Sequence, residues 1–318
     1  MNNKKTIIIT GANSGLGLSC ARMIAGTSPE YQVILACRNK AKAERAKQDI
    51  IESCGNSNIH VLELDVSSIA SVRNFVKRYK ELQFPPLYGL ICNAGISGMN
   101  TETTSDGYDS VFATNHLGHF LLVNLLLSSM QSTGRIIMIS SDMHCPPGKE
   151  LTWPGALALA HPDNKLKKNH MLRYSFSKLC NLYFTYELSR RLSDINSKIV
   201  INAFNPGLMT ETNFTGKHPR FLTFVVKKIF ADRVGSLEKS AKGLADLLTE
   251  PIYGEKTGKY FDRGTVESKS SSLSYNLENA LDLWNKSVEF TKIEHDEIYY
   301  RFLRDRFRFC VNLQSDVR

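Results

Sequence analysis

The sequence predicts an α/β protein with one doubly wound parallel sheet of about seven strands and helices on both faces. Short β-branched apolar runs, typical of strands buried on both faces, alternate with longer stretches of helical apolar spacing. A glycine-rich turn follows the first run, at residues 10–17. Of the 318 residues, 42% are hydrophobic and 22% charged, which is the composition of soluble globular proteins.

The net charge of +9 and the seven cysteines limit the classes of function. There is no C-x-x-C pair, so the cysteines predict neither a disulfide framework nor a metal site. Free thiols indicate a reducing compartment, and we expect a cytoplasmic protein. No apolar run reaches the roughly 18 residues of a membrane-spanning helix. The first strand begins too early to leave room for a signal peptide.

The first turn, T-G-A-N-S-G-L-G, lies between a predicted strand at 6–9 and a predicted helix at 18–25. This arrangement presents backbone N–H groups and a positive helix end to a phosphate. Glycine is needed because a side chain would hold a pyrophosphate away from the backbone. The spacing is G-x-x-x-G-x-G, so the turn alone fits an ordinary strand–helix connection equally well.

The second predicted strand, 32–37, ends at Cys37 and is followed by Arg38. Dinucleotide-binding folds that take NAD place an acid on the ribose hydroxyls at this point, about 20 residues past the glycines. Here no acid is present, and Arg38 is placed to bind a 2′-phosphate. The position favours NADP(H) over NAD(H). The alternative is that Arg38 is a solvated surface charge.

A predicted helix at 40–53 leads to a third strand at 59–64, which ends at Asp65. Asp65 either accepts a hydrogen bond from an adenine amino group or caps the helix that begins near Ser68. The fourth predicted strand, 87–92, ends in the sequence N-A-G. Small residues there let the chain pass close to a flat ligand or to a neighbouring backbone.

A long helix is predicted from about residue 105 to 130, with Asn115 and Gly118 in its interior. Both residue types cost stability in a helix, up to about 1 kcal/mol for glycine. Asn115 is therefore either a satisfied core amide or part of a site. For His116 and His119, packing or capping explains the residues as well as chemistry does.

The fifth predicted strand, 134–139, ends at Ser141, and residues 146–169 are predicted to be irregular. Tyr174 and Lys178 then open a helix that runs to about residue 192. Because they are four positions apart, they share one face of that helix. A surface contact would explain such a pair equally well.

The sixth predicted strand, 199–204, precedes Pro206 and Gly207. We expect residues 208–235 to form a substrate lid, because 217–230 is apolar and aromatic with a basic face. The same pattern leaves open a segment that lies on a membrane. A helix at 236–249 and a short last strand at 258–261 complete the domain.

The C-terminal extension, 293–318, alternates aromatic residues with arginines. It contains five Arg against five Asp and Glu, so its net charge is zero. Base stacking would suit the aromatics, but this balance argues against nucleic acid. We expect a helix that docks on the body, residues 1–292, or on a partner.

Taken together, the order of these motifs resembles the short-chain dehydrogenase/reductase family. The resemblance covers about residues 5–265 and implies a Rossmann-type fold. Within the family the chain is most similar to the branch that holds protochlorophyllide reductases and retinol dehydrogenases. The stretches that carry this likeness are T-N-H-L-G-H-F at 114–120, A-C-R-N at 36–39, S-K-L-C-N at 177–181 and the long segment before Tyr174.

The resemblance implies a catalytic set of four residues: Asn115, Ser141, Tyr174 and Lys178. It implies that the cofactor contacts, besides Tyr174 and Lys178, are Gly11, Asn13, Ser14, Gly15, Leu16, Gly17, Arg38, Asp65, Val66, Asn93, Ala94, Gly95, Pro206, Gly207 and Thr210. Glu211 stands where the family has Ser or Thr, so Thr210 or Thr212 would take that contact. Cys180 resembles a cysteine of the protochlorophyllide reductases, whereas N-A-G at 93–95 is the ordinary family form.

These residues suit carbonyl reduction, which needs a hydride at carbon and a proton at oxygen. A tyrosine, with a pKa of about 10, is a poor base at neutral pH. We expect the Lys178 ammonium and an oxidised nicotinamide together to lower the pKa of Tyr174 toward the working range. Lys178 would also hold the nicotinamide ribose, and Ser141 would donate to the substrate oxygen. Asn115 would interrupt its helix and hold a water that links Lys178 to solvent.

Three hypotheses follow. The first is an NADP(H)-dependent oxidoreductase for a bulky, apolar carbonyl or alcohol, with Tyr174 as proton donor or acceptor. The second is a tetrapyrrole reductase of the protochlorophyllide type. It is supported by Cys180 and by the lysines at 165, 167 and 168. The third is a non-catalytic NADP(H)-binding interaction protein. Family analogy adds the expectation of a homodimer.

Overall fold

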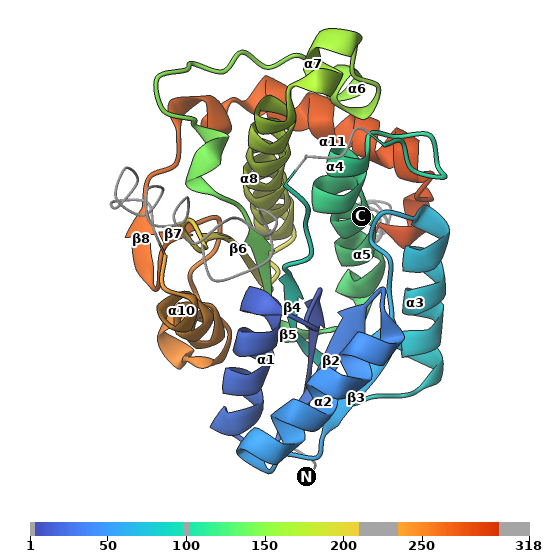
Figure 1. Ribbon diagram of the computed structural model, residues 1–318, viewed down its shortest axis with the longest axis vertical. Helices are drawn as coiled ribbons and strands as arrows, with labels where there is room; N and C mark the ends of the chain where they lie inside the picture. The colour runs from blue at the N-terminus through green and yellow to red at the C-terminus, as the bar shows by residue number, and fades with distance from the viewer. Residues whose placement is uncertain (1–3, 98–101, 210–234, 299–318) are drawn as a thin grey trace, which may run out of the picture.

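The computed structural model describes residues 4–97, 102–209 and 235–298 (Figure 1). They form an eight-stranded sheet in the order β3-β2-β1-β4-β5-β6-β7-β8. The strands are β1 Lys5–Thr10, β2 Tyr31–Cys37, β3 Ile59–Glu63, β4 Leu87–Cys92, β5 Met130–Ile139, β6 Val200–Asn205, β7 Tyr260–Asp262 and β8 Val266–Ser268. All pairs are parallel except β7 with β8. The predicted doubly wound parallel sheet is confirmed.

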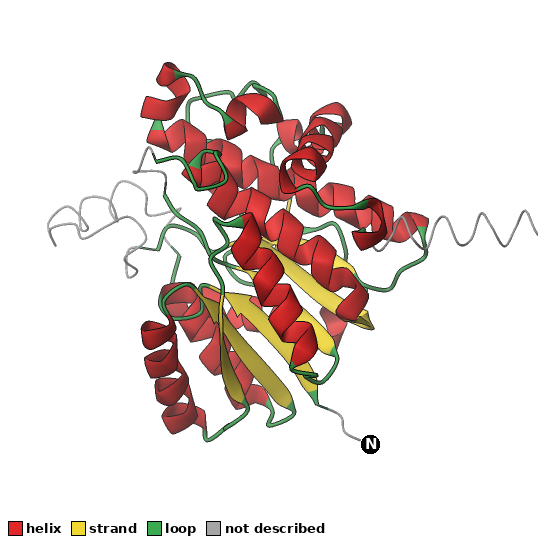
Figure 2. Ribbon diagram, turned by 90° about the vertical axis from the view of Figure 1, so that its right-hand side faces the viewer, coloured by secondary structure: helices red, strands yellow, loops and turns green. Residues whose placement is uncertain are grey.

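Helices cover both faces of this sheet, as Figure 2 shows. On one face lie α1 Gly15–Thr27, α2 Lys40–Cys54 and α10 Leu237–Thr249. On the other lie α3 Ile69–Glu81, α5 Gly118–Leu126 and α8 His170–Asp194. Because successive side chains of a strand point to opposite faces, Ile8 packs in one core and Ile7 and Ile9 in the other. That burial explains the unbroken apolar run of β1.

The predicted sheet needs one correction, since the chain adds an eighth, antiparallel strand after the expected last one. The residues of β8 are largely exposed and carry no apolar run that would have indicated a strand. The stretch predicted to be irregular likewise contains two short helices, α6 Ala156–Ala160 and α7 Asn164–Lys168. Helices of five residues leave little periodicity to detect.

The predicted helix at 105–130 is also shorter and less regular than expected. It begins with α4, Ser110–Phe112. The side-chain oxygen of Asp109 caps the N-terminus of α4 by accepting hydrogen bonds from the N–H groups of residues 111 and 112. A π-helical turn, Ala113–Leu117, then separates α4 from α5. The span Ser110–Ser129 has the length and hydropathy of a membrane helix, but 89% of its apolar window is buried inside the domain. It is therefore a core helix here.

The sequence analysis missed helix α11, Leu277–Thr291, which packs along α8. Its Trp284 lies 5.7 Å from the ring of Phe184 and 5.0 Å from that of Phe120, between ring centroids. The same core continues to Ile293 and Ile298. The first residues of the predicted C-terminal extension thus pack on the body, and residues 299–318 lie outside the described part.

We expect the protein to lose stability in acid because two histidines, His116 and His119, are buried in the core. Burial lowers the pKa of His116 to about 3 and that of His119 to about 4. In the unfolded chain both would titrate near their usual pKa of about 6.5. Stability from the neutral rings is therefore complete above pH 6.5 and falls as the pH drops toward 4. Between pH 7 and 5 we expect the free energy of unfolding to fall by about 4 kcal/mol.

Urea denaturation at pH 7, 6 and 5 measures this slope. The variant in which both histidines are replaced, His116→Asn with His119→Asn, should be less stable at pH 7 but should lose most of the slope. Equal free energies of unfolding for the parent at pH 7 and pH 5 would contradict the expectation.

Candidate active site

The carboxyl ends of β1, β4, β5 and β6 meet at one edge of the sheet, because these neighbouring strands are parallel. The glycine-rich turn, residues 93–95, Ser141 and the Pro206–Gly207 segment follow these four strands directly. Helix α8, which carries Tyr174 and Lys178, packs beside β5 and β6. The fold therefore brings the separate sequence motifs to a common edge.

The glycine-rich turn has the geometry that suits an anion. Gly11 and Gly15 adopt positive φ angles of 66° and 54°, which favour glycine. A Cβ on Gly17 would lie 2.5 Å from Asn93 Nδ2, so close packing requires glycine there as well. Ser14 stands at the N-cap of α1, but its side chain makes no capping hydrogen bond. The first N–H groups of α1 can therefore serve a phosphate group.

Arg38 and Asp65 lie together where β2 and β3 end. Arg38 Nη1 is 3.6 Å from Asp65 Oδ2, and the arginine side chain is 78% exposed. Asp65 Oδ1 accepts from the backbone and hydroxyl of Ser67, and it closes the turn before α3. Ser68, which accepts from the N–H of Ser71, is the cap of that helix. The expectation that Asp65 caps the helix is thus wrong, and an exposed pair like this one is weak.

Thr10 joins the end of β1 to the end of β4. Its Oγ1 accepts from the N–H groups of Asn93 at 2.8 Å and Ala94 at 2.9 Å. In return, Asn93 Nδ2 donates to the Thr10 carbonyl at 2.8 Å. The sequence analysis did not single out Thr10. A threonine at the buried end of an apolar strand was the available signal.

Asn115 lies within the π-helical turn and ties the loop after β4 to α8. Its Oδ1 accepts from the Ile96 N–H at 2.8 Å, and its Nδ2 donates to the Ile96 carbonyl and to Ser177 Oγ. Ser177 Oγ in turn donates to the Tyr174 carbonyl at 2.7 Å. The local break of the helix at Asn115 is confirmed. Ser177, which carries the contact onward, was missed.

Tyr174 and Ser141 are in side-chain hydrogen-bond contact. Ser141 Oγ also donates to Asp142 Oδ1 at 3.1 Å and accepts from the Met143 N–H at 3.2 Å. Burial raises the pKa of Tyr174, the hydrogen bond with Ser141 lowers it, and the Asp142 carboxylate raises it again. The net pKa shift is upward. Burial therefore outweighs any effect of Lys178 in the protein alone, and the lowering expected from the ammonium together with a nicotinamide stays a prediction.

The ammonium group of Lys178 is held at the end of β5. The side chain is buried, and Nζ donates to the Ile139 carbonyl at 3.1 Å. Nζ lies 5.4 Å from the centroid of the Tyr174 ring. Burial lowers the pKa of Lys178 to about 8. An amine with this pKa is still mostly charged at pH 7, but burial of the phenol dominates the pKa of Tyr174, so lowering that pKa requires a further positive charge.

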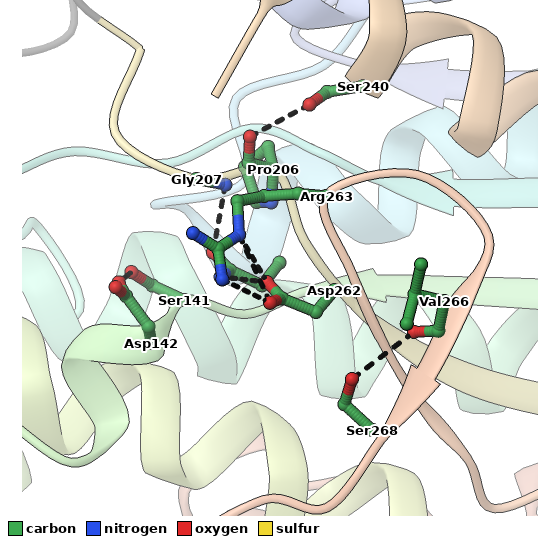
Figure 3. A network of polar contacts seen from close by, with 10 residues as sticks. Ser141, Asp142, Pro206, Gly207, Ser240, Asp262, Arg263, Val266 and Ser268 are labelled. Carbon is green, nitrogen blue, oxygen red and sulfur yellow. Dashed lines mark hydrogen bonds and ion pairs between the residues drawn. The ribbon is translucent and has the colours of Figure 1, made fainter. Parts of the chain in front are cut away.

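The segment after β6 is held by a polar network, which Figure 3 shows. Gly207, with φ of 77°, donates its N–H to Asn205 Oδ1 at 3.0 Å. Asn205 Nδ2 donates to Asp262 Oδ1 at 2.7 Å, and Arg263 Nε contacts both oxygens of Asp262 at 3.0 Å. Residues 210–234 lie outside the described part, and with them Thr210, Glu211, Thr212, most of the predicted lid and the segment 217–230.

Cys180 cannot play the part that a tetrapyrrole reductase would require. Its side chain has no exposed surface and packs with Leu179 and Tyr183 in a core cluster. Burial also raises the pKa of its thiol. A group so enclosed reaches neither solvent nor a ligand in this structure, so Cys180 gives the second hypothesis no support here, and the lysines at 165, 167 and 168 remain its other argument.

Two other observations bear on ligands. A surface cavity of about 310 Å³ lies between α8, the loop before β7 and the start of α11, and its lining includes Tyr186, Tyr275 and Leu277. No predicted site residue lines it, so it is separate from the edge described above. Within residues 4–97, 102–209 and 235–298, no cluster of three or more His, Cys, Asp or Glu forms a metal site.

Comparison with known proteins agrees with this geometry. A family model for short chain dehydrogenases matches residues 5–151. The chloroplastic short-chain dehydrogenase TIC 32 A of Brassica napus is 34% identical over 294 residues, which cover 90% of this chain and 88% of that protein. Retinol dehydrogenase 13 of Homo sapiens is 35% identical over 298 residues, covering 91% of this chain and 85% of that protein.

A crystal structure of a protein from Mycobacterium paratuberculosis is 30% identical and superposes with a TM-score of 0.70. It covers 91% of this chain and 94% of its own. Fold, motif order and similarity over nine-tenths of the sequence therefore agree. This chain belongs to the short-chain dehydrogenase/reductase family of oxidoreductases, whose members use nicotinamide cofactors.

Proposed function

We propose that this protein is an NADP(H)-dependent oxidoreductase that acts on a bulky, apolar carbonyl or alcohol, with Tyr174 as proton donor or acceptor. The observation that carries the proposal is the hydrogen-bond contact of Tyr174 with Ser141, beside the buried Lys178, at the carboxyl edge of a parallel sheet. The similarity to a retinol dehydrogenase supports an apolar alcohol or aldehyde as substrate class.

The residues of the edge fit a dinucleotide. The uncapped N-terminus of α1 and the glycines at positive φ suit a pyrophosphate. Residues 93–95 and the Pro206–Gly207 segment would hold the nicotinamide half, and Lys178 its ribose. The bound nicotinamide would supply or take up the hydride, and its positive oxidised form would provide the charge that lowers the pKa of Tyr174.

The chain's own groups then handle the proton. Ser141 lies beside the phenol and would donate to the substrate oxygen once its hydroxyl proton, which points to Asp142 in the protein alone, turns to the substrate. Tyr174 gives its proton to that oxygen during reduction and takes one during oxidation. Asn115 and Ser177 keep the backbone of Tyr174 in register with residue 96. A water held near Asn115 as a relay to Lys178 remains a prediction.

Arg38 provides the test of cofactor choice. With Arg38→Gln we expect kcat/KM for NADPH to fall about tenfold or more, because the 2′-phosphate loses a charged partner. The value for NADH should change by less than about twofold, since no phosphate is present to lose that partner. Steady-state kinetics with both cofactors on a long-chain aldehyde or retinal measure this. Equal losses for NADPH and NADH would contradict the assignment.

A further inference from the structure

His119 is a buried titratable residue that the proposed chemistry does not use. It lies in the first turn of α5, with no exposed surface, four positions after Asn115. Its Nε2 is 2.9 Å from Thr10 Oγ1, and its Nδ1 is 3.3 Å from the Asn115 carbonyl. The ring therefore lies between the start of the glycine-rich turn and the catalytic asparagine.

The hydrogen bonds of Thr10 decide which ring nitrogen carries the proton. A hydroxyl has one proton and two lone pairs. Both lone pairs of Thr10 Oγ1 are engaged by the N–H groups of Asn93 and Ala94. The hydroxyl proton can go to His119 Nε2 at 2.9 Å or to the Ile91 carbonyl at 3.4 Å, and the shorter contact is favoured.

Nε2 must then be an acceptor, so the neutral ring carries its proton on Nδ1 and donates it to the Asn115 carbonyl. Burial keeps the ring neutral, since it lowers the pKa of His119 to about 4. The nearby Lys178 ammonium favours the same neutral form. One tautomer satisfies all three segments, and the other would set two donors against each other.

We propose that His119, as its Nδ1–H tautomer, is a positioning residue that locks the end of β1, the Asn93–Ala94 loop and Asn115 into one arrangement. The inference rests on the proposed function only in so far as these three segments face the cofactor. Loss of the ring would take from the Thr10 hydroxyl its nearest acceptor and from the Asn115 carbonyl the Nδ1–H donor, at the edge that would bind the dinucleotide. Affinity for the cofactor should suffer more than the fold.

The first test does not depend on activity. In protein labelled with ¹⁵N-histidine, NMR at pH 7 should show a neutral ring with a protonated Nδ1 and an unprotonated Nε2, and His119→Gln should remove that signal. An imidazolium, or an Nε2–H tautomer at this position, would overturn the proposal.

The second test separates the two hydrogen bonds by chemistry. Glutamine places an oxygen near the position of Nε2 and can accept from Thr10, whereas asparagine places an N–H near that of Nδ1 and can donate to residue 115. Phenylalanine keeps the ring volume and does neither. We expect His119→Phe to raise the NADP+ dissociation constant about tenfold or more, and His119→Gln and His119→Asn to raise it less.

His116→Phe is the matched control, because His116 is equally buried but reaches Ser287 on α11. It should lower the melting temperature and leave the NADP+ dissociation constant within about twofold. If folded His119→Phe binds NADP+ as the parent does, or if His116→Phe weakens binding equally, the positioning role is refuted. A parent that binds neither NADP+ nor NAD+ would refute the proposed function, and the tautomer experiment would still decide the structural claim.

Discussion

Tyr174→Phe is expected to lower kcat about a thousandfold or more while the protein remains folded. The phenol is the group in contact with Ser141, and proton transfer by a positioned side chain contributes roughly 10² to 10⁴ in rate. Phenylalanine keeps the ring, so α8 should pack as before. The NADP+ dissociation constant should change by less than about threefold, because the phenol is expected to act on the substrate.

Tyr186→Phe is the matched control for this experiment. Tyr186 lies further along α8, and its hydroxyl is 2.6 Å from Ser270 Oγ, in the wall of the separate cavity. Its loss should leave kcat unchanged within about twofold. Steady-state and single-turnover kinetics on both variants give the comparison. Turnover by Tyr174→Phe near that of the parent would remove Tyr174 from its assigned role.

The second large effect concerns stability. Asp109 and Arg173 form an ion pair whose side chains are each only 2% exposed, with Nε 3.0 Å from Oδ2. Removal of one partner leaves the other charge buried, which costs about 3 to 5 kcal/mol. Asp109→Asn keeps the oxygen that caps α4 and removes only the charge. We expect it to lower the melting temperature by roughly 10 °C.

Two companion variants make this result specific. The double variant Asp109→Asn with Arg173→Met should recover much of the loss, because no charge is then left unpaired. Lys242→Met breaks the Lys242–Asp246 pair, which lies 2.6 Å apart on the exposed face of α10, and should cost less than about 1 kcal/mol. A loss for Asp109→Asn as small as that for Lys242→Met would mean that water reaches the buried pair.

Much of the fold could be predicted because the strands are buried on both faces. Runs such as residues 33–37 are then apolar throughout, and that pattern is visible without coordinates. The position of the site follows as well, since parallel strands end at one edge. Helix α11 was not predicted because its sequence mixes buried and exposed apolar residues. Leu283 and Trp284 are buried, whereas Leu277 and Leu281 are exposed, and this obscures the helical spacing of the apolar residues.

What the sequence could not supply are contacts between distant residues. A Cβ on Gly118 would lie 1.8 Å from the Val66 carbonyl, which explains a helical glycine that costs stability by propensity. The direction of the Tyr174 pKa shift depends on the burial of the phenol and on the Asp142 carboxylate, and four-residue spacing reveals neither. The hydrogen bond from Asn115 to Ser177 joins α8 to a different helix, so no local rule predicts it.

The position of Trp284 has a consequence for how the protein is made. The rings that enclose it, Phe120 and Phe184, are synthesised long before residue 284, yet they share one aromatic cluster with it. In a nascent chain on the ribosome, the apolar surface around Phe120 and Phe184 therefore stays exposed until α11 emerges and Trp284 can pack against it. Chains that stop before residue 277 should accordingly be clients of chaperones and proteases, although all eight described strands and all the predicted catalytic residues have already been translated.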